Sequence, residues 1–249
     1  PYTFKWIEVL LRWSHVLFAI LWVGNSFLFN YLDNKLNKDI SSDDVDGEGY
    51  LMHSGYYYKL TRLKKSPPLQ YLSSLVIFKW QSYLTFITGI LLLIVLYYYN
   101  AGILIVDKKV LEISPSIAIL ISLSSMVLSW LVYDFLCKSK LIDNSIFFSI
   151  TCLILATLVS YILTQIYGSR AAYIHVGACL GTIMAANVFR IIIPSQKNMV
   201  DAALTNKEPK LQKSIDAKIR SIHNNYITLP VLFIMISSHF PFTYGHKYN

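Results

Sequence analysis

Charged residues are scarce in this sequence. Only 14% of its 249 residues are Asp, Glu, Lys or Arg, whereas soluble domains carry about 25%. Hydrophobic residues make up 55% of the chain, and the mean hydropathy is +0.47. This composition excludes an ordinary water-soluble domain. We therefore look for apolar segments of about 20 residues that could cross a lipid bilayer.

Cysteine and acidic residues are also few. The three cysteines, Cys137, Cys152 and Cys179, form neither a C-x-x-C nor a C-x-x-C-H motif, so the sequence offers no zinc spacing and no covalent haem attachment. Basic residues exceed acidic ones by 22 to 14. They lie mainly between apolar runs, which indicates a membrane-topology signal rather than a nucleic-acid site.

Apolar runs of suitable length recur along the chain. Each is expected to form a transmembrane helix, since a helix pairs its own backbone groups in lipid. The sequence predicts an all-α, polytopic integral membrane helix bundle of about six transmembrane helices, forming one domain over residues 1–249. Longer polar loops should follow spans one and five, the second with a short amphipathic helix at 208–220. The six runs are 7–31, 76–99, 116–136, 145–167, 171–193 and 225–240.

Lys and Arg are distributed unevenly between the expected loops. Most of them follow spans one, three and five. By the positive-inside rule these loops are cytoplasmic, so the N-terminus should face outward. We also expect this sequence to be a fragment of a longer chain.

Two histidines lie inside predicted spans. His15 and His175 open similar stretches, residues 15–29 and 175–189, and both are displaced toward the outer ends of spans one and five. Histidines at similar depth on parallel helices could ligate one haem iron from opposite faces. Alternatively, each could hydrogen-bond to a neighbouring helix. Arg12, one turn before His15, could pair with a haem propionate or extend to the surface.

A second polar group is expected at the inner side. His223, Asn224, Asn225 and Tyr226 stand where the sixth span begins, and Lys79 opens the second span. Amide, imidazole and ammonium groups beside aromatic walls suit a planar polar ligand. Taken singly, each residue is also ordinary for a helix mouth or a loop.

Several polar stretches resemble the bacterial membrane-bound urate oxidase family. They are GEGYLMHSGYYY, FKWQSYLTFITG, AAYIHVGACLGTIMAANVF, IIIPSQKNMV, RSIHNNYITLPVLFIMIS and HFPFTYGHKYN. The resemblance implies oxidation of urate to 5-hydroxyisourate in purine catabolism, in a bacterial inner membrane or an equivalent energy-transducing membrane. It also implies a C-terminal cytochrome c that passes electrons to the respiratory chain. Family-like polar positions are His15, Glu48, His53, Lys79, His175, Asn187, His223, Asn224 and Asn225.

If the substrate is urate, these residues can be assigned roles as a hypothesis. Lys79 would neutralise the urate anion, and His53 or His223 would act as general base. Haem b would be held by His15 and His175, with Arg12 beside it, while haem c would belong to a separate or missing domain. Residues expected to bind the purine are Glu48, Asn224, Asn225 and Tyr226.

Two departures from the family pattern stand out. No C-x-x-C-H is present, and Ser54 and Tyr56 flank Gly55 in a glycine-rich patch. The substrate could therefore be urate or a similar planar purine. Expected partners are cytochrome c, the lipid bilayer and respiratory complex subunits, without nucleic acid. Two other classes stay open: a haem-binding electron-transfer subunit and a purine or small-anion transporter. The Trp13-x-His15 pattern also resembles small haem-containing membrane oxidases of porphyrin synthesis, which supports only the haem expectation.

Overall fold

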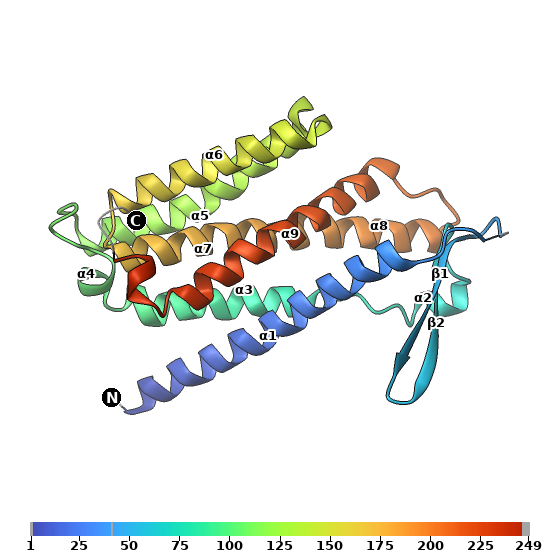
Figure 1. Cartoon of the computed structure of the whole chain (residues 1–249), viewed down its shortest axis with the longest axis horizontal. Helices are drawn as coiled ribbons and strands as arrows, with labels where there is room; N and C mark the ends of the chain where they lie inside the picture. Colours follow the sequence, from blue (N-terminus) through green and yellow to red (C-terminus); the bar gives the residue numbers. More distant parts are fainter. Residues whose placement is uncertain (1, 41, 246–249) are drawn as a thin grey trace.

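The computed structural model describes residues 2–40 and 42–245, which form a bundle of long helices with one β-hairpin (Figure 1). The α-helices are α1 Tyr2–Lys35, α2 Leu69–Leu72, α3 Trp80–Leu93, α4 Ala101–Leu104, α5 Pro115–Lys138, α6 Ser145–Thr164, α7 Ser169–Ala186, α8 Ile193–Leu204 and α9 Leu211–Ser237. The strands are β1 Val45–His53 and β2 Tyr56–Leu63. Two π-helical segments, η1 Ile94–Tyr98 and η3 Asn187–Ile192, and two 3₁₀ turns, η2 Lys140–Asp143 and η4 Pro241–Thr243, complete the order.

The expected membrane helix bundle is confirmed. Within the described residues, five helices are long and apolar enough to cross a membrane: Tyr2–Lys35, Trp80–Tyr98, Pro115–Lys138, Ser145–Thr164 and Ser169–Leu204. The sixth expected span is the C-terminal part of α9, whose first half carries most of the charges of that helix. The protein therefore has the helices of a polytopic membrane protein.

Two segments differ from the sequence prediction. The loop expected from residue 194 is helical as far as Leu204, because α7, η3 and α8 form one continuous helix. Pro194 lies just after η3, where a π-helical register can accommodate a missing backbone donor. The second correction concerns α9, which is continuous from Leu211 to Ser237. His223 to Tyr226 therefore lie in the middle of a helix, not at its mouth.

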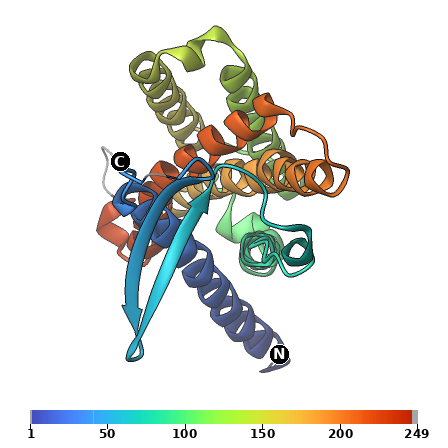
Figure 2. The same cartoon turned by 90° about the vertical axis from the view of Figure 1, so that its right-hand side faces the viewer.

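The β-hairpin was not predicted. Its strands pair in antiparallel register around Ser54 and Gly55, whose φ angles of 51° and 80° fit a tight two-residue turn. Backbone hydrogen bonds between Asn37 and Glu48 attach β1 to the chain just after α1. The hairpin projects sideways from one end of the bundle (Figure 2).

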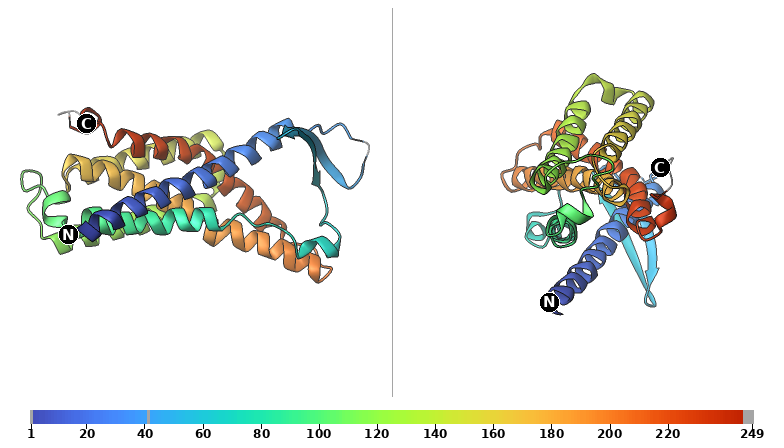
Figure 3. Two further views of the ribbon diagram at one scale, coloured as in Figure 1. Left: turned by 90° about the horizontal axis from the view of Figure 1, so that it is seen from below. Right: turned by 90° about the vertical axis from the view of Figure 1, so that its left-hand side faces the viewer.

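The two ends of the bundle differ. At one end, here called the hairpin end, the hairpin and α8 extend beyond the other helices; the opposite end, here called the α4 end, holds α4 and the start of α1 (Figure 3). The loops predicted to be rich in Lys and Arg lie at the hairpin end. None of the described residues of α1 is buried, whereas α7 packs centrally against α5, α6 and α9. The main apolar core lies around α7 toward the α4 end and includes Tyr97, Tyr167 and Ala171.

Candidate functional site

Six polar side chains meet between α5, η3 and α9, toward the hairpin end. We call this set the polar network: Tyr133, Asp134, Asn187, Arg220, His223 and Asn224. All but His223, which is partly buried, are buried, and Asn187 is 0% exposed. A buried polar group is costly unless it is hydrogen-bonded, and the contacts below supply those bonds.

Asn187 is the centre of the polar network. Its Nδ2 donates to Asn224 Oδ1 at 3.0 Å and to the Tyr133 hydroxyl at 3.2 Å, while its Oδ1 accepts from Arg220 Nη1 at 3.2 Å. Arg220 Nη2 also donates to Asp134 Oδ1 at 2.6 Å. A guanidinium only donates, so it fixes which way the Asn187 amide is turned. The result is a connected set of bonds across three helices.

His223 is bound into this network through one ring nitrogen. Because the Tyr133 hydroxyl accepts from Asn187, its own proton is free to be donated to His223 Nδ1, 2.8 Å away. The His223 ring also stacks on Phe148 of α6, with centroids 4.9 Å apart. These contacts favour a neutral imidazole with its proton on Nε2. His223 is therefore held as a hydrogen-bond acceptor between helices.

The other residues expected in an inner substrate site lie elsewhere. Tyr226 is 73% exposed on the outside of α9, and Asn225 makes no side-chain hydrogen bond within the described residues. Glu48 forms an ion pair with Lys59 inside the hairpin, and His53 is exposed at its tip. Lys79 lies at the start of α3 over the Trp80 ring. Of the residues expected in the inner substrate site, the structure thus brings only His223 and Asn224 into one hydrogen-bonded network.

His175 lies in the core near the α4 end. It is 0% exposed, and its Nδ1 donates to the carbonyl of Ala171 at 2.7 Å. Its ring contacts Tyr167 and Tyr97, with centroids at 4.8 and 6.1 Å. The Nε2 atom is buried and has no hydrogen-bond partner in the described part of the chain. A buried imidazole nitrogen without a partner indicates a ligand position.

His15 uses its Nδ1 in a similar way. This atom donates to the carbonyl of Thr85 at 3.0 Å and lies 3.1 Å from Thr88 Oγ1. The ring also packs closely over Gly89, where a Cβ atom would approach it within 3.1 Å. His15 therefore fastens α1 to α3, and its Nε2 is left for another interaction.

His15 and His175 contact the α3–η1 helix at different positions along its axis. His15 contacts Thr88, whereas His175 contacts Tyr97, nine residues further along. At 1.5 Å per residue this separation is roughly 13 Å. Each ring alone fits an iron ligand, since a backbone carbonyl holds Nδ1–H and leaves Nε2 free. Within the described residues no cluster of three or more His, Cys, Asp or Glu could hold a bare metal ion.

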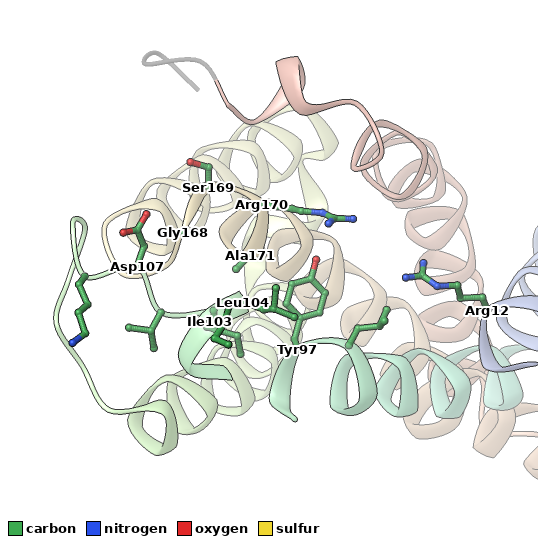
Figure 4. A pocket seen from close by; sticks show the side chains of 13 residues that line it. Arg12, Tyr97, Ile103, Leu104, Asp107, Gly168, Ser169, Arg170 and Ala171 are labelled. Atoms are coloured by element: carbon green, nitrogen blue, oxygen red, sulfur yellow. The ribbon is translucent and has the colours of Figure 1, made fainter. Parts of the chain in front are cut away.

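A cavity of about 480 Å³ opens beside His175 at the α4 end (Figure 4). We call it the α4-end cavity. Its lining comes from α1, η1, the α4 region and the start of α7, and includes Arg12, Tyr97, Asp107, Arg170 and Ala171. In Figure 4 the guanidinium groups of Arg12 and Arg170 extend toward each other above the Tyr97 ring. Tyr97 and Ala171 line the cavity and also contact His175.

Sequence reasoning missed several of these residues. Arg220 was assigned to a surface helix, and Tyr133 was indistinguishable from other aromatic residues of a span. Asp134 was the readable signal, because a carboxylate within an apolar run requires a buried cation. Asn187 was already among the family-like positions, and like Tyr97 it lies in a π-helical segment, a feature that occurs frequently at functional sites.

Comparison with known proteins identifies the chain. No curated protein and no solved structure matches it. The sequence profile described as urate oxidase N-terminal matches residues 1–249, the whole chain. The expected resemblance is thereby confirmed, and the chain belongs to the urate oxidase N-terminal family.

Proposed function

We propose that this protein oxidises urate, or a closely similar planar purine, to the 5-hydroxy product and passes the electrons to a cytochrome c. The observation that carries this proposal is the family match over every residue of the chain. The helices suited to a bilayer agree with an enzyme that delivers electrons to a membrane respiratory chain. Urate and one water molecule give the 5-hydroxy product, two electrons and two protons, so the protein needs access for water and a route for both electrons and protons.

The proposed electron carrier is haem b, with the partnerless Nε2 of His175 as its iron ligand. His15 contacts the α3–η1 helix roughly 13 Å away along its axis, so it is not placed to bind the same iron. When bound, haem iron accepts and releases single electrons. The chain contributes the hydrogen bond from His175 Nδ1–H to the carbonyl of Ala171, which sets the tautomer that leaves Nε2 free. Arg12, which lines the cavity beside His175, supplies a guanidinium group for a haem carboxylate.

The proposed orientation places the hairpin end in the cytoplasm. The loops rich in Lys and Arg lie there, as the positive-inside rule requires. The N-terminus and the α4-end cavity then face outward, in a bacterial inner membrane or an equivalent membrane. A cytochrome c on the outer side, on a separate or missing domain, would accept the electrons.

The test is the visible spectrum of protein purified from haem-replete cells. The wild type should show a Soret band that shifts on reduction, and urate added without oxygen should produce the same shift. His175→Ala should remove the band, whereas His53→Ala, a change in the exposed hairpin tip, should retain it. A colourless wild-type preparation that also leaves urate unoxidised would overturn the proposal.

A haem-binding electron-transfer subunit is the second candidate, because the free Nε2 of His175 serves either function. The anaerobic urate experiment separates the two, since an electron-transfer subunit would bind haem and leave it oxidised with urate. A transporter is disfavoured, since Pro230 lies inside the continuous helix α9 rather than at a break.

A further inference from the structure

The α4-end cavity has the size and walls of a small-molecule site. Its volume of about 480 Å³ falls within the usual range of roughly 300 to 1,000 Å³ for ligand pockets. Leu96, Tyr97, Ile103 and Leu104 supply apolar and aromatic surface from two separate segments. The Tyr97 ring supplies one flat aromatic surface, which suits a planar heterocycle.

The charged groups that line the cavity differ in whether they already have an ion-pair partner. Arg12 is paired with Glu8 at 2.9 Å, and Lys108 lies 3.7 Å from Glu112. Arg170 has no carboxylate partner among the described residues, and it extends toward the space above Tyr97 (Figure 4). Guanidinium groups bind planar anions through paired hydrogen bonds. Arg170 is therefore the cation available to a ligand.

Asp107 also lines the cavity, but it lies against Gly168, across the first turn of α7 from Arg170 (Figure 4). One carboxylate oxygen accepts the backbone N–H of Lys109, and the carboxylate makes no ion pair within the described residues. A carboxylate accepts hydrogen bonds from N–H groups. Because Asp107 and Arg170 face different sides of this turn, Arg170 is the group that can pair with an anionic ligand above Tyr97. A purine monoanion such as urate carries its negative charge on a flat ring system.

Membrane topology does not explain these arginines. Basic residues concentrate at the hairpin end, where the positive-inside rule requires them if that end is cytoplasmic. Arg12 and Arg170 stand at the opposite end, on two different helices, and line one cavity. An anionic ligand would explain why two arginines from different helices line the same cavity.

The cavity also lies next to the buried histidine. Tyr97 lines the cavity and meets the His175 ring edge-on, and the carbonyl of Ala171, another lining residue, accepts the His175 Nδ1–H. A ligand in the cavity would therefore be one side-chain layer from His175. This is a short path for an electron that leaves the ligand.

We propose that the α4-end cavity binds the purine monoanion over the Tyr97 ring, with Arg170 pairing its negative edge. This assignment rests on the proposed function and adds the location of the substrate. It moves the substrate from the hairpin end, where the sequence suggested it, to the opposite end. A carboxylate of bound haem shares the same anionic chemistry, so the experiment must separate the two ligands.

The experiment measures the equilibrium dissociation constant of radiolabelled urate on detergent-purified full chain, together with the haem content from the Soret band. Arg170→Gln should weaken urate binding by roughly 10- to 100-fold, the effect of losing one charged hydrogen bond, and leave the haem content unchanged. Arg190→Gln is the matched control, because Arg190 is also exposed and lies on η3, in the part of the bundle that carries the polar network. Leu104→Trp, which fills the cavity, should weaken urate binding without loss of haem.

The outcomes are distinct. Weaker urate binding in Arg170→Gln and Leu104→Trp, with wild-type binding in Arg190→Gln, supports the assignment. If Arg170→Gln loses haem, the cavity holds a haem carboxylate and the assignment is overturned. If the wild type oxidises urate and Arg170→Gln binds it equally well, the substrate site lies elsewhere while the proposed function stands. If the wild type neither binds nor oxidises urate, the proposed function itself fails.

Discussion

Replacement of Asn187 by leucine should strongly destabilise the bundle. Asn187 is fully buried and makes three side-chain hydrogen bonds, to Arg220, Tyr133 and Asn224. One involves a charged donor, worth about 1.5–3 kcal/mol, and two are neutral, worth about 0.5–1.5 kcal/mol each. Leucine restores none of them and leaves Arg220 Nη1 and Asn224 Oδ1 buried without this partner. The free energy of unfolding should fall by about 3–5 kcal/mol.

The assay is unfolding in mixed detergent micelles, followed by far-ultraviolet circular dichroism. Asn225→Leu is the matched control, since Asn225 is half-buried and outside the polar network. Its effect should stay within about 0.5 kcal/mol. Equal losses in the two variants, or a loss below about 1 kcal/mol for Asn187→Leu, would show that the polar network does not hold α9 against η3.

Two further changes test the packing of α7 and α9 and the buried ion pair. A Cβ at Gly177 would come within 2.9 Å of Ile234 Cγ2, whereas a Cβ at Gly181 would meet nothing within 4 Å. In the same unfolding assay, Gly177→Ala should therefore destabilise by about 1–2 kcal/mol and Gly181→Ala should stabilise by up to about 1 kcal/mol; stabilisation by both would contradict the close approach. Asp134→Leu should cost about 3–5 kcal/mol by leaving the Arg220 guanidinium buried without its carboxylate, and adding Arg220→Leu should recover part of that loss. A double-mutant cycle should give a coupling energy above about 1 kcal/mol, and additive effects would refute the ion pair.

The helices whose starts the sequence predicted well begin with capping residues that can be read from the local sequence. Helices α5 and α6 begin at Pro115 and Ser145, within one residue of the predicted starts. The side chains of Ser114 and Asn144 accept backbone hydrogen bonds there as N-caps. Apolar length and local capping are both readable without tertiary information, so these elements could be placed from the sequence.

The hairpin and the polar network could not be predicted from apolar length and local capping. The Ser54–Gly55 turn directly before the tyrosine run 56–58 was a readable hairpin signal, but the charged residues around it suggested a loop. The network joins residues far apart in sequence: Asp134 and Arg220 are 86 positions apart. Asn224 looked like a helix-mouth residue because Asn is favoured at helix caps and turns, whereas within α9 it is paired with distant partners, Asn187 and the carbonyl of Met184. Those partners become visible only in three dimensions.

The continuous helix Ser169–Leu204 has a consequence for how other macromolecules can approach this protein. Its 36 residues correspond to about 54 Å, against a hydrocarbon layer of about 30 Å. The part of the helix that is longer than the hydrocarbon layer extends beyond it at the hairpin end, which would keep bulky molecules away from the bilayer on that side. At the α4 end, α6 and α7 are joined by only four residues, 165–168, so a globular docking protein could approach the lipid surface closely beside Arg170.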